Sequence, residues 1–106
     1  MIDFPSRIAA LPAFEGPFDA HRLAAEGCDV LFARYPAGAA IDAHSHESHN
    51  VGVIIAGELI LTVDGVETRH GIGSWYELRS GTVHAARFEV DTAEIELWFQ
   101  PHGSAT

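Results

Sequence analysis

Three histidines lie close together near the middle of the chain. Seven of the 106 residues are histidine, and His44, His46 and His49 fall within one short segment. Neutral imidazole is a common ligand of divalent transition metals, and residues two apart in a β-strand project to the same face. His44 and His46 can therefore present two imidazoles to one ion. A single histidine is more often solvated or hydrogen-bonded, so it is the spacing of this group that predicts a metal site.

Short strand-like runs must position these side chains. Such runs recur about every 8–12 residues between glycine, proline and aspartate, a pattern typical of an all-β sandwich or barrel. The expected strands are Phe18–Leu23, Asp29–Tyr35, Ala40–His44, Asn50–Ala56, Glu58–Val63, Val66–His70, Gly73–Leu78, His84–Glu89 and Ala93–Gln100. Asp64-Gly65 separates two of them and predicts a tight hairpin, because a type I′ turn needs positive φ at both central residues.

Composition excludes several classes of function. The formal charge is −9, which disfavours nucleic acid and membrane partners, and no apolar stretch reaches the ~18 residues of a membrane span. All six basic residues are arginines, so Schiff-base chemistry and a Walker-type phosphate loop are absent. Cys28 stands alone, which leaves no intrachain disulfide. We expect no signal peptide and a cytoplasmic protein, because the first eleven residues lack a basic start followed by a long apolar run.

The length predicts one domain with a single core. Residues 1–17 contain three prolines and a short apolar patch, and we expect them to form an arm with one helical turn that packs on the outside. The β-domain is expected at residues 18–101, followed by a C-terminal tail at 102–106.

The segment around the histidines resembles the first motif of the cupin family. That motif is a glycine, five residues, His-x-His, three residues, a glutamate, six residues and a glycine. Gly38, His44, His46 and Gly57 meet every spacing, and Asn50 stands where the family has glutamate.

A second cupin motif follows at the expected distance. It consists of a glycine, five residues, Pro-x-Gly, two residues, a histidine, three residues and an asparagine. Gly73, Gly81 and His84 match it, whereas Arg79 stands at the proline position and Phe88 at the asparagine position. The two motifs and the spacer between them run from Gly38 to Phe88, about half of the chain.

The resemblance implies a single-domain cupin β-barrel, a jelly-roll-like double-stranded β-helix, with a divalent metal on His44, His46, Asn50 and His84. Three imidazoles and an amide suit Zn, Ni, Fe, Mn or Cu better than Mg²⁺ or Ca²⁺, which favour oxygen ligands. His49 is an alternative fourth ligand. Strand alternation favours Asn50, because His49 faces outward if Asn50 faces inward.

The resemblance leaves the reaction open, since cupins include dioxygenases, isomerases, decarboxylases, lyases and cyclases. We expect a metal-dependent enzyme acting on a small carbonyl- or carboxylate-bearing molecule, because uncharged ligands leave the ion's charge uncompensated. A non-catalytic binding or sensing module is the alternative. Small cupins pair through their sheet edges, so a homodimer is also expected. The arm and an apolar run are the candidate segments that would cover these edges. That run is Ala93, Ile95, Leu97 and Phe99.

Overall fold

A computed structural model describes residues 2–16 and 18–99, and these residues are almost entirely β-structure. The elements in chain order are α1 (Ser6–Ala9), β1 (Asp19–Ala25), β2 (Cys28–Tyr35), β3 (Ala40–His44), β4 (His49–Ala56), β5 (Leu59–Val63), β6 (Val66–His70), β7 (Trp75–Leu78), β8 (His84–Arg87) and β9 (Thr92–Phe99). Among the described residues, no helix has the length and apolar character needed to cross a membrane.

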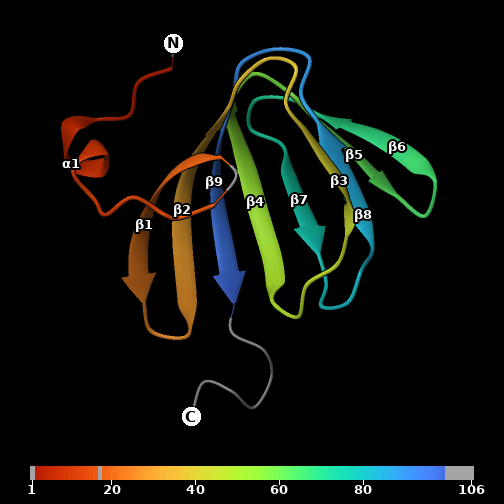
Figure 1. Ribbon diagram of the computed structural model, residues 1–106, viewed down its shortest axis with the longest axis horizontal. Coiled ribbons are helices and arrows are strands. Elements are labelled where there is room, and N and C mark those ends of the chain that lie inside the picture. Colours follow the sequence, from red (N-terminus) through yellow and green to blue (C-terminus); the bar gives the residue numbers. More distant parts are fainter. Residues whose placement is uncertain (1, 17, 100–106) are drawn as a thin grey trace.

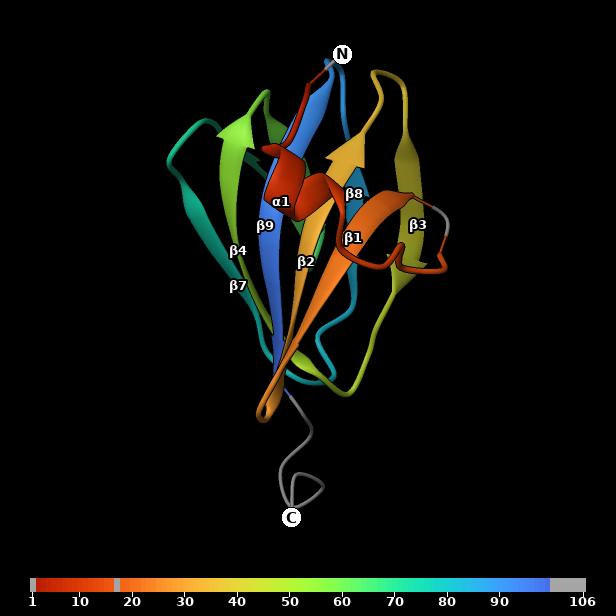
Figure 2. The same cartoon turned by 90° about the vertical axis from the view of Figure 1, so that its left-hand side faces the viewer.

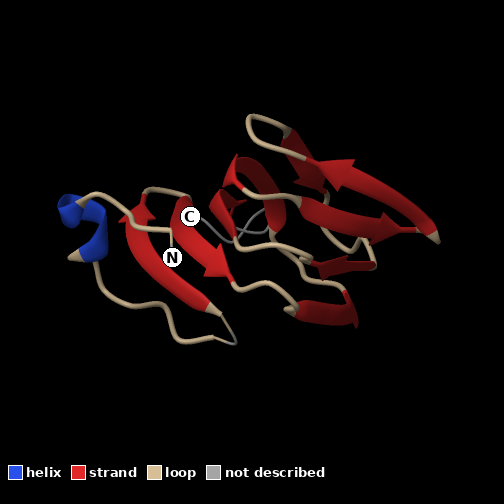
Figure 3. Ribbon diagram, turned by 90° about the horizontal axis from the view of Figure 1, so that it is seen from above, coloured by secondary structure: helices blue, strands red, loops and turns tan. Residues whose placement is uncertain are grey.

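The strands form two antiparallel sheets (Figures 1 and 3). One has five strands in the order β1-β2-β9-β4-β7, and the other has four in the order β3-β8-β5-β6. The last strand, β9, lies between β2 and β4 and joins the two halves of the larger sheet. The inner faces of both sheets line one interior, where the buried core lies.

All nine predicted strands are present, with differences only at their ends. The predicted strand from Gly73 begins at Trp75 instead, because Gly73 has a φ of +83° and belongs to the preceding turn. The predicted end at Gln100 and the tail at 102–106 lie outside the described residues. The hairpin prediction is confirmed: Asp64 and Gly65 have φ angles of 52° and 74°, and Val63 pairs with Val66 across them.

Strand alternation decides which side chains enter the interior. On β4 the buried positions are Asn50, Gly52 and Ile54, and on β7 they are Tyr76 and Leu78. The neighbouring Trp75 is 61% exposed on the outer face, as expected for adjacent residues in a strand. Each inward position therefore either fills the core or faces the cavity within it.

The first part of the N-terminal segment packs against the outside of the five-stranded sheet, where α1 lies near β1 and β2 (Figure 2), whereas Phe14 packs against the core and lines the interior cavity. Phe4 makes edge contacts with His21 and Phe32, at ring-centroid distances of 6.1 and 6.2 Å. Arg34 donates a hydrogen bond to the carbonyl of Ile2 at 3.1 Å, and its guanidinium lies 5.5 Å from the Phe4 ring centroid. These contacts hold the arm on the barrel.

Candidate metal centre

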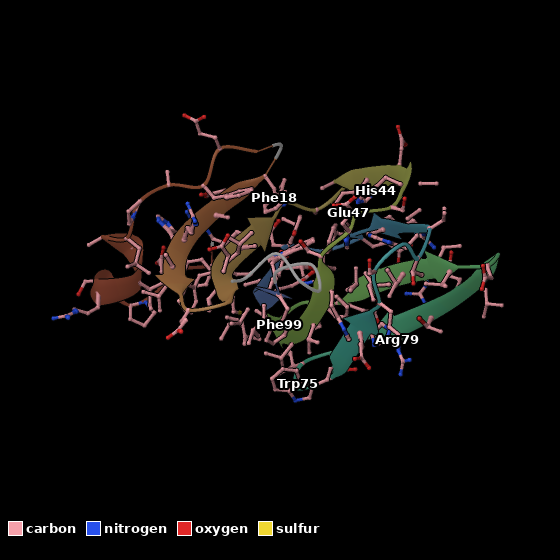
Figure 4. The ribbon with its side chains drawn as sticks, turned by 90° about the horizontal axis from the view of Figure 1, so that it is seen from below. Phe18, His44, Glu47, Trp75, Arg79 and Phe99 are labelled. Carbon is pink, nitrogen blue, oxygen red and sulfur yellow. The ribbon has the colours of Figure 1, made fainter. Side chains whose placement is uncertain are left out.

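Three histidines meet at the end of the barrel where β3 ends and β8 begins. His44 is the last residue of β3, His84 is the first residue of β8, and His46 lies in the loop between β3 and β4. One ring nitrogen from each lies within 4.8 Å of the other two. Figure 4 looks onto this end of the molecule and shows His44 beside Glu47, with Arg79 pointing away from the barrel.

The three imidazoles have the same tautomer, because each Nδ1 contacts a backbone carbonyl oxygen two residues away in the sequence. The contacts are His44 with Asp42 at 2.8 Å, His46 with Ser48 at 3.0 Å and His84 with Thr82 at 2.9 Å. A carbonyl oxygen only accepts, so each Nδ1 carries the proton and each Nε2 keeps a free lone pair. Metal-ligating histidines commonly use such contacts to fix ring orientation.

The Nε2 atom of His46 is buried and has no hydrogen-bond partner among the described residues. A buried polar atom without a partner is costly, and a metal ion removes that cost. Three nitrogens bound to one ion at about 2.1 Å lie within roughly 4 Å of one another, so small side-chain rotations close this cluster around an ion. The residues present therefore fit a divalent transition metal.

The loops that hold the cluster are joined directly. The backbone N–H of Gly81 donates to the carbonyl of His46 at 2.9 Å, which links the β7–β8 loop to the β3–β4 loop. Gly81 has a φ of +82°, a conformation that glycine adopts without strain. This explains why the second sequence motif carries a glycine three residues before His84.

Asn50 and His49 point in opposite directions, as the alternation argument predicted. Asn50 is 2% exposed, lines the interior cavity and donates from Nδ2 to the carbonyl of Leu97 at 3.2 Å. The side chain of His49 is 40% exposed and its Nε2 pairs with Glu77 at 2.5 Å on the outer face. His49 is not part of the histidine cluster, and Asn50 as the fourth ligand stays a prediction.

A cavity of about 440 Å³ extends from the cluster into the barrel. His44, Asn50 and His84 line it near the cluster, and most of the remaining wall is apolar. The apolar part comes from both sheets and includes Leu31, Ile41, Leu59, Leu61, Leu78, Ala86 and Phe88. Phe88, at the second motif's asparagine position, is 2% exposed and stacks on Tyr35 at 4.2 Å.

Two glutamates of β9 also line this cavity, each 2% exposed. Glu96 accepts hydrogen bonds from the Tyr35 hydroxyl at 2.5 Å and the Trp98 indole N–H at 3.0 Å. Glu94 accepts one from the Tyr76 hydroxyl at 2.6 Å, and each of the two carboxyls influences the pKa of the other. Trp98 in turn packs against His46 at 4.7 Å between ring centroids, so this network adjoins the cluster.

Burial raises the pKa of Glu94 well above its ordinary value, and the charge of Glu96 raises it further. Burial raises the pKa of Glu96 as well, although the hydrogen bonds from Tyr35, Trp98 and Glu94 oppose this. Two adjacent buried carboxylates repel, so the raised pKa of Glu94 favours a pair that shares one proton. Near the mouth, burial lowers the pKa of His84, which favours the neutral, ligating imidazole.

The carboxyl pair is the part of the cavity that sequence reasoning missed. The sequence places Glu94, Glu96 and Trp98 on one face of the last strand, yet carboxylates in strands are usually solvated, so no role was assigned to them. Arg34 does not line this cavity; it pairs with Asp19 and with the arm. Glu47 is exposed.

A family model described as the cupin domain matches residues 31–99, and the chain therefore belongs to the cupin family. The matched segment contains all four sequence-predicted ligand positions. Among curated proteins, no relative matches the sequence.

Solved structures support the same fold. An RmlC-like cupin from Shewanella frigidimarina aligns with a TM-score of 0.77 at 17% identity, covering 92% of this chain and 91% of its own. A cupin 2 conserved barrel domain protein from Salinispora arenicola aligns at 0.74 and 18% identity, covering 94% and 89%. The DMSP lyase DddQ from Ruegeria pomeroyi aligns at 0.72 and 23% identity, covering 87% of this chain and 54% of its own. These similarities show the fold.

Proposed function

We propose that this cupin is a metal-dependent enzyme that acts on a small carbonyl- or carboxylate-bearing molecule. His44, His46 and His84 would hold a divalent transition metal, with Asn50 as the fourth protein ligand. The observation that carries the proposal is the contact of all three Nδ1 atoms with backbone carbonyls, together with the buried, unpartnered Nε2 of His46. A bound ion would polarise a carbonyl or carboxylate oxygen of the substrate.

The chain's own residues would bind and enclose that substrate. Backbone carbonyls of Asp42, Ser48 and Thr82 orient the imidazoles, and the apolar wall around Phe88 limits water beside the reacting group. Similarity in fold to a lyase supports an enzymatic role without choosing the reaction.

Metal content tests the proposal directly. Protein purified without a histidine tag should contain about one transition metal per chain by elemental mass spectrometry, and His44→Ala should lose most of it. His49→Ala is the matched control, because His49 lies outside the cluster. Equal metal content in the His44→Ala variant and the parent would show that the site is wrongly assigned.

Access to the metal is tested by replacing it with Co²⁺. Acetate, oxalate or acetylacetone at millimolar concentration should change the visible spectrum if a coordination position is open to a substrate oxygen. A spectrum unmoved by all three would show a closed, structural metal site and contradict the proposed enzyme. A spectrum that responds without turnover of any candidate substrate would support the binding or sensing module instead.

A further inference from the structure

The cavity contains a second polar surface besides the histidine cluster, formed by Glu94, Glu96, Tyr35, Tyr76 and Trp98. All five line the same cavity, where hydrogen bonds join Tyr35 and Trp98 to Glu96 and join Tyr76 to Glu94. Nothing in the proposed metal chemistry uses these groups. Burying two carboxyls in a largely apolar wall costs free energy. We therefore expect these groups to contact the molecule that the cavity binds.

Counting donors and acceptors shows what this network offers to a ligand. The Tyr35 hydroxyl and Trp98 N–H donate to Glu96, and the Tyr76 hydroxyl donates to Glu94. In each of these bonds the carboxyl is the acceptor. The hydroxyl and indole donors of the network are therefore occupied, and the network presents carboxyl oxygens to a ligand in the cavity.

The network also lies at a defined depth from the metal site. Trp98 pairs with Asn50, Glu96 pairs with Gly52, and Glu94 pairs with Ile54 across the β4–β9 ladder. Two residues of strand advance roughly 7 Å, so the carboxyl pair begins about that distance deeper than Asn50. His44 and His84 of the histidine cluster line the same cavity, and the ring of their neighbour His46 contacts Trp98.

We propose that the Glu94–Glu96 pair is a specificity site for the hydrogen-bond donor of a ligand whose oxygen is bound at the histidine cluster. The ligand would be a small acid or carbonyl compound with a hydroxyl or ammonium group roughly 7 Å from its metal-binding oxygen. This inference rests on the proposed function for the position of the oxygen. An analogue without the donor would leave the buried carboxyl oxygens facing an apolar group. The cost of these unpaired acceptors would make the analogue bind more weakly.

Four-carbon acids test the inference on the metal-loaded, full-length protein. Calorimetry should give 4-hydroxybutanoate or 4-aminobutanoate an affinity at least about tenfold higher than that of butanoate. If 4-aminobutanoate binds more tightly than 4-hydroxybutanoate, the site favours a cationic donor. If 4-hydroxybutanoate binds more tightly, the site favours a neutral donor. Equal affinity for all three acids, including no measurable binding, overturns the inference.

Two variants separate the carboxyl pair from general effects of acidity. Glu94→Gln keeps the side-chain shape but places an amide N–H donor in the network, so the preference for the donor-bearing acids should fall several-fold. Glu47→Gln makes the same chemical change at an exposed position and should retain the preference. Loss of the preference in both variants, or in neither, contradicts the assignment.

An infrared difference spectrum gives a measurement that does not depend on the metal. The carboxyl bands of the Glu94–Glu96 pair should shift when 4-hydroxybutanoate is added and stay in place with butanoate. An unmoved band with both donor-bearing acids overturns this inference, whatever the Co²⁺ spectrum does. A shifted band with an unmoved Co²⁺ spectrum contradicts the proposed function instead.

Discussion

Asn50 occupies the position at which this chain departs from the family's first motif. Its side chain is buried at the level of Trp98 and donates to the carbonyl of Leu97, which orients the amide. An amide oxygen is neutral, whereas a carboxylate would add charge and a stronger metal bond. If Asn50 is the fourth ligand, as proposed, it would set how much positive charge a bound ion retains for a substrate oxygen.

Substitution at Asn50 should change metal affinity in both directions. Asn50→Glu should tighten binding, because a carboxylate offsets the ion's charge, and Asn50→Ala should weaken it only modestly. Competition with a coloured chelator measures both. If His49→Ala causes the larger loss, the fourth ligand is His49, and equal losses for Asn50→Ala and His44→Ala would show that the amide is a principal ligand.

Glu94 makes the free energy of unfolding of the metal-free protein depend on pH. The sign of this dependence follows from the raised pKa of Glu94. Above about pH 4.3 an unfolded glutamate loses its proton, whereas the native state retains the proton on Glu94. The native state then binds more protons, so the free energy of unfolding falls as pH rises towards the native pKa. The contribution of Glu94 to the free energy of unfolding is complete below the pKa of glutamate in the unfolded chain, and it is lost as the pH rises through the native pKa.

Glu94→Gln removes this titration and should stabilise the metal-free protein progressively as pH rises from 4.5 to 8. Urea denaturation at several pH values measures the difference from the parent. Glu47→Gln, at an exposed position, should show little difference across the same range. A Glu94→Gln effect that does not change with pH would show that the native carboxyl is ionised throughout.

At the scale of single elements, Gly52 on β4 makes room for the ring of Tyr76 on β7. A Cβ built on Gly52 would lie 2.4 Å from Tyr76 ring atoms. The Tyr76 ring therefore occupies the space that any side chain at position 52 would need. This close approach lets the Tyr76 hydroxyl reach Glu94 at 2.6 Å. The glycine therefore belongs to the carboxyl network although it supplies no polar group.

Gly52→Ala should displace Tyr76 and destabilise the protein by about 1–3 kcal/mol, the usual cost of overpacking. Gly71→Ala is the matched control, because a Cβ there meets nothing within 4 Å and the backbone φ is ordinary. Thermal denaturation compares the two variants. Similar melting temperatures for both would mean that the sheet adjusts around Tyr76 at little cost.

The strands and the histidine cluster could be predicted from the sequence because their signals are local. Alternation and turn residues define β5 and β6 around Asp64-Gly65, and the spacing of the two motifs brings His84 to His44 and His46. The carboxyl network could not be predicted, because it depends on which strands flank β9. Only the observed strand order brings Tyr35 and Tyr76 to the two glutamates.

For the whole molecule, the outer face of the five-stranded sheet offers a surface for a second copy of the chain. Cross-strand pairing places Phe32, Ile95, Val53 and Trp75 in one row from β2 to β7. Trp75 is 61% exposed, and Phe99, further along β9, is 40% exposed. The arm covers only the β1–β2 side of this face, through Phe4.

We propose a homodimer that buries the β9–β4–β7 part of this face. Light scattering at micromolar concentration should return about twice the chain mass of 11.4 kDa, and Trp75→Glu should lower it by placing a charge in the interface. Val66→Glu is the control, since Val66 is 62% exposed on the other sheet. A parent mass equal to one chain would contradict the dimer.

The central position of β9 also bears on how the chain is made and folded. During synthesis β1, β2, β4 and β7 all leave the ribosome before β9, yet β2 and β4 are joined only through it. Until Thr92–Phe99 emerges, both strands present open edges, which are sites of misassociation. Closure of the barrel must therefore wait for nearly the whole described chain, and such long-range pairing makes folding slow.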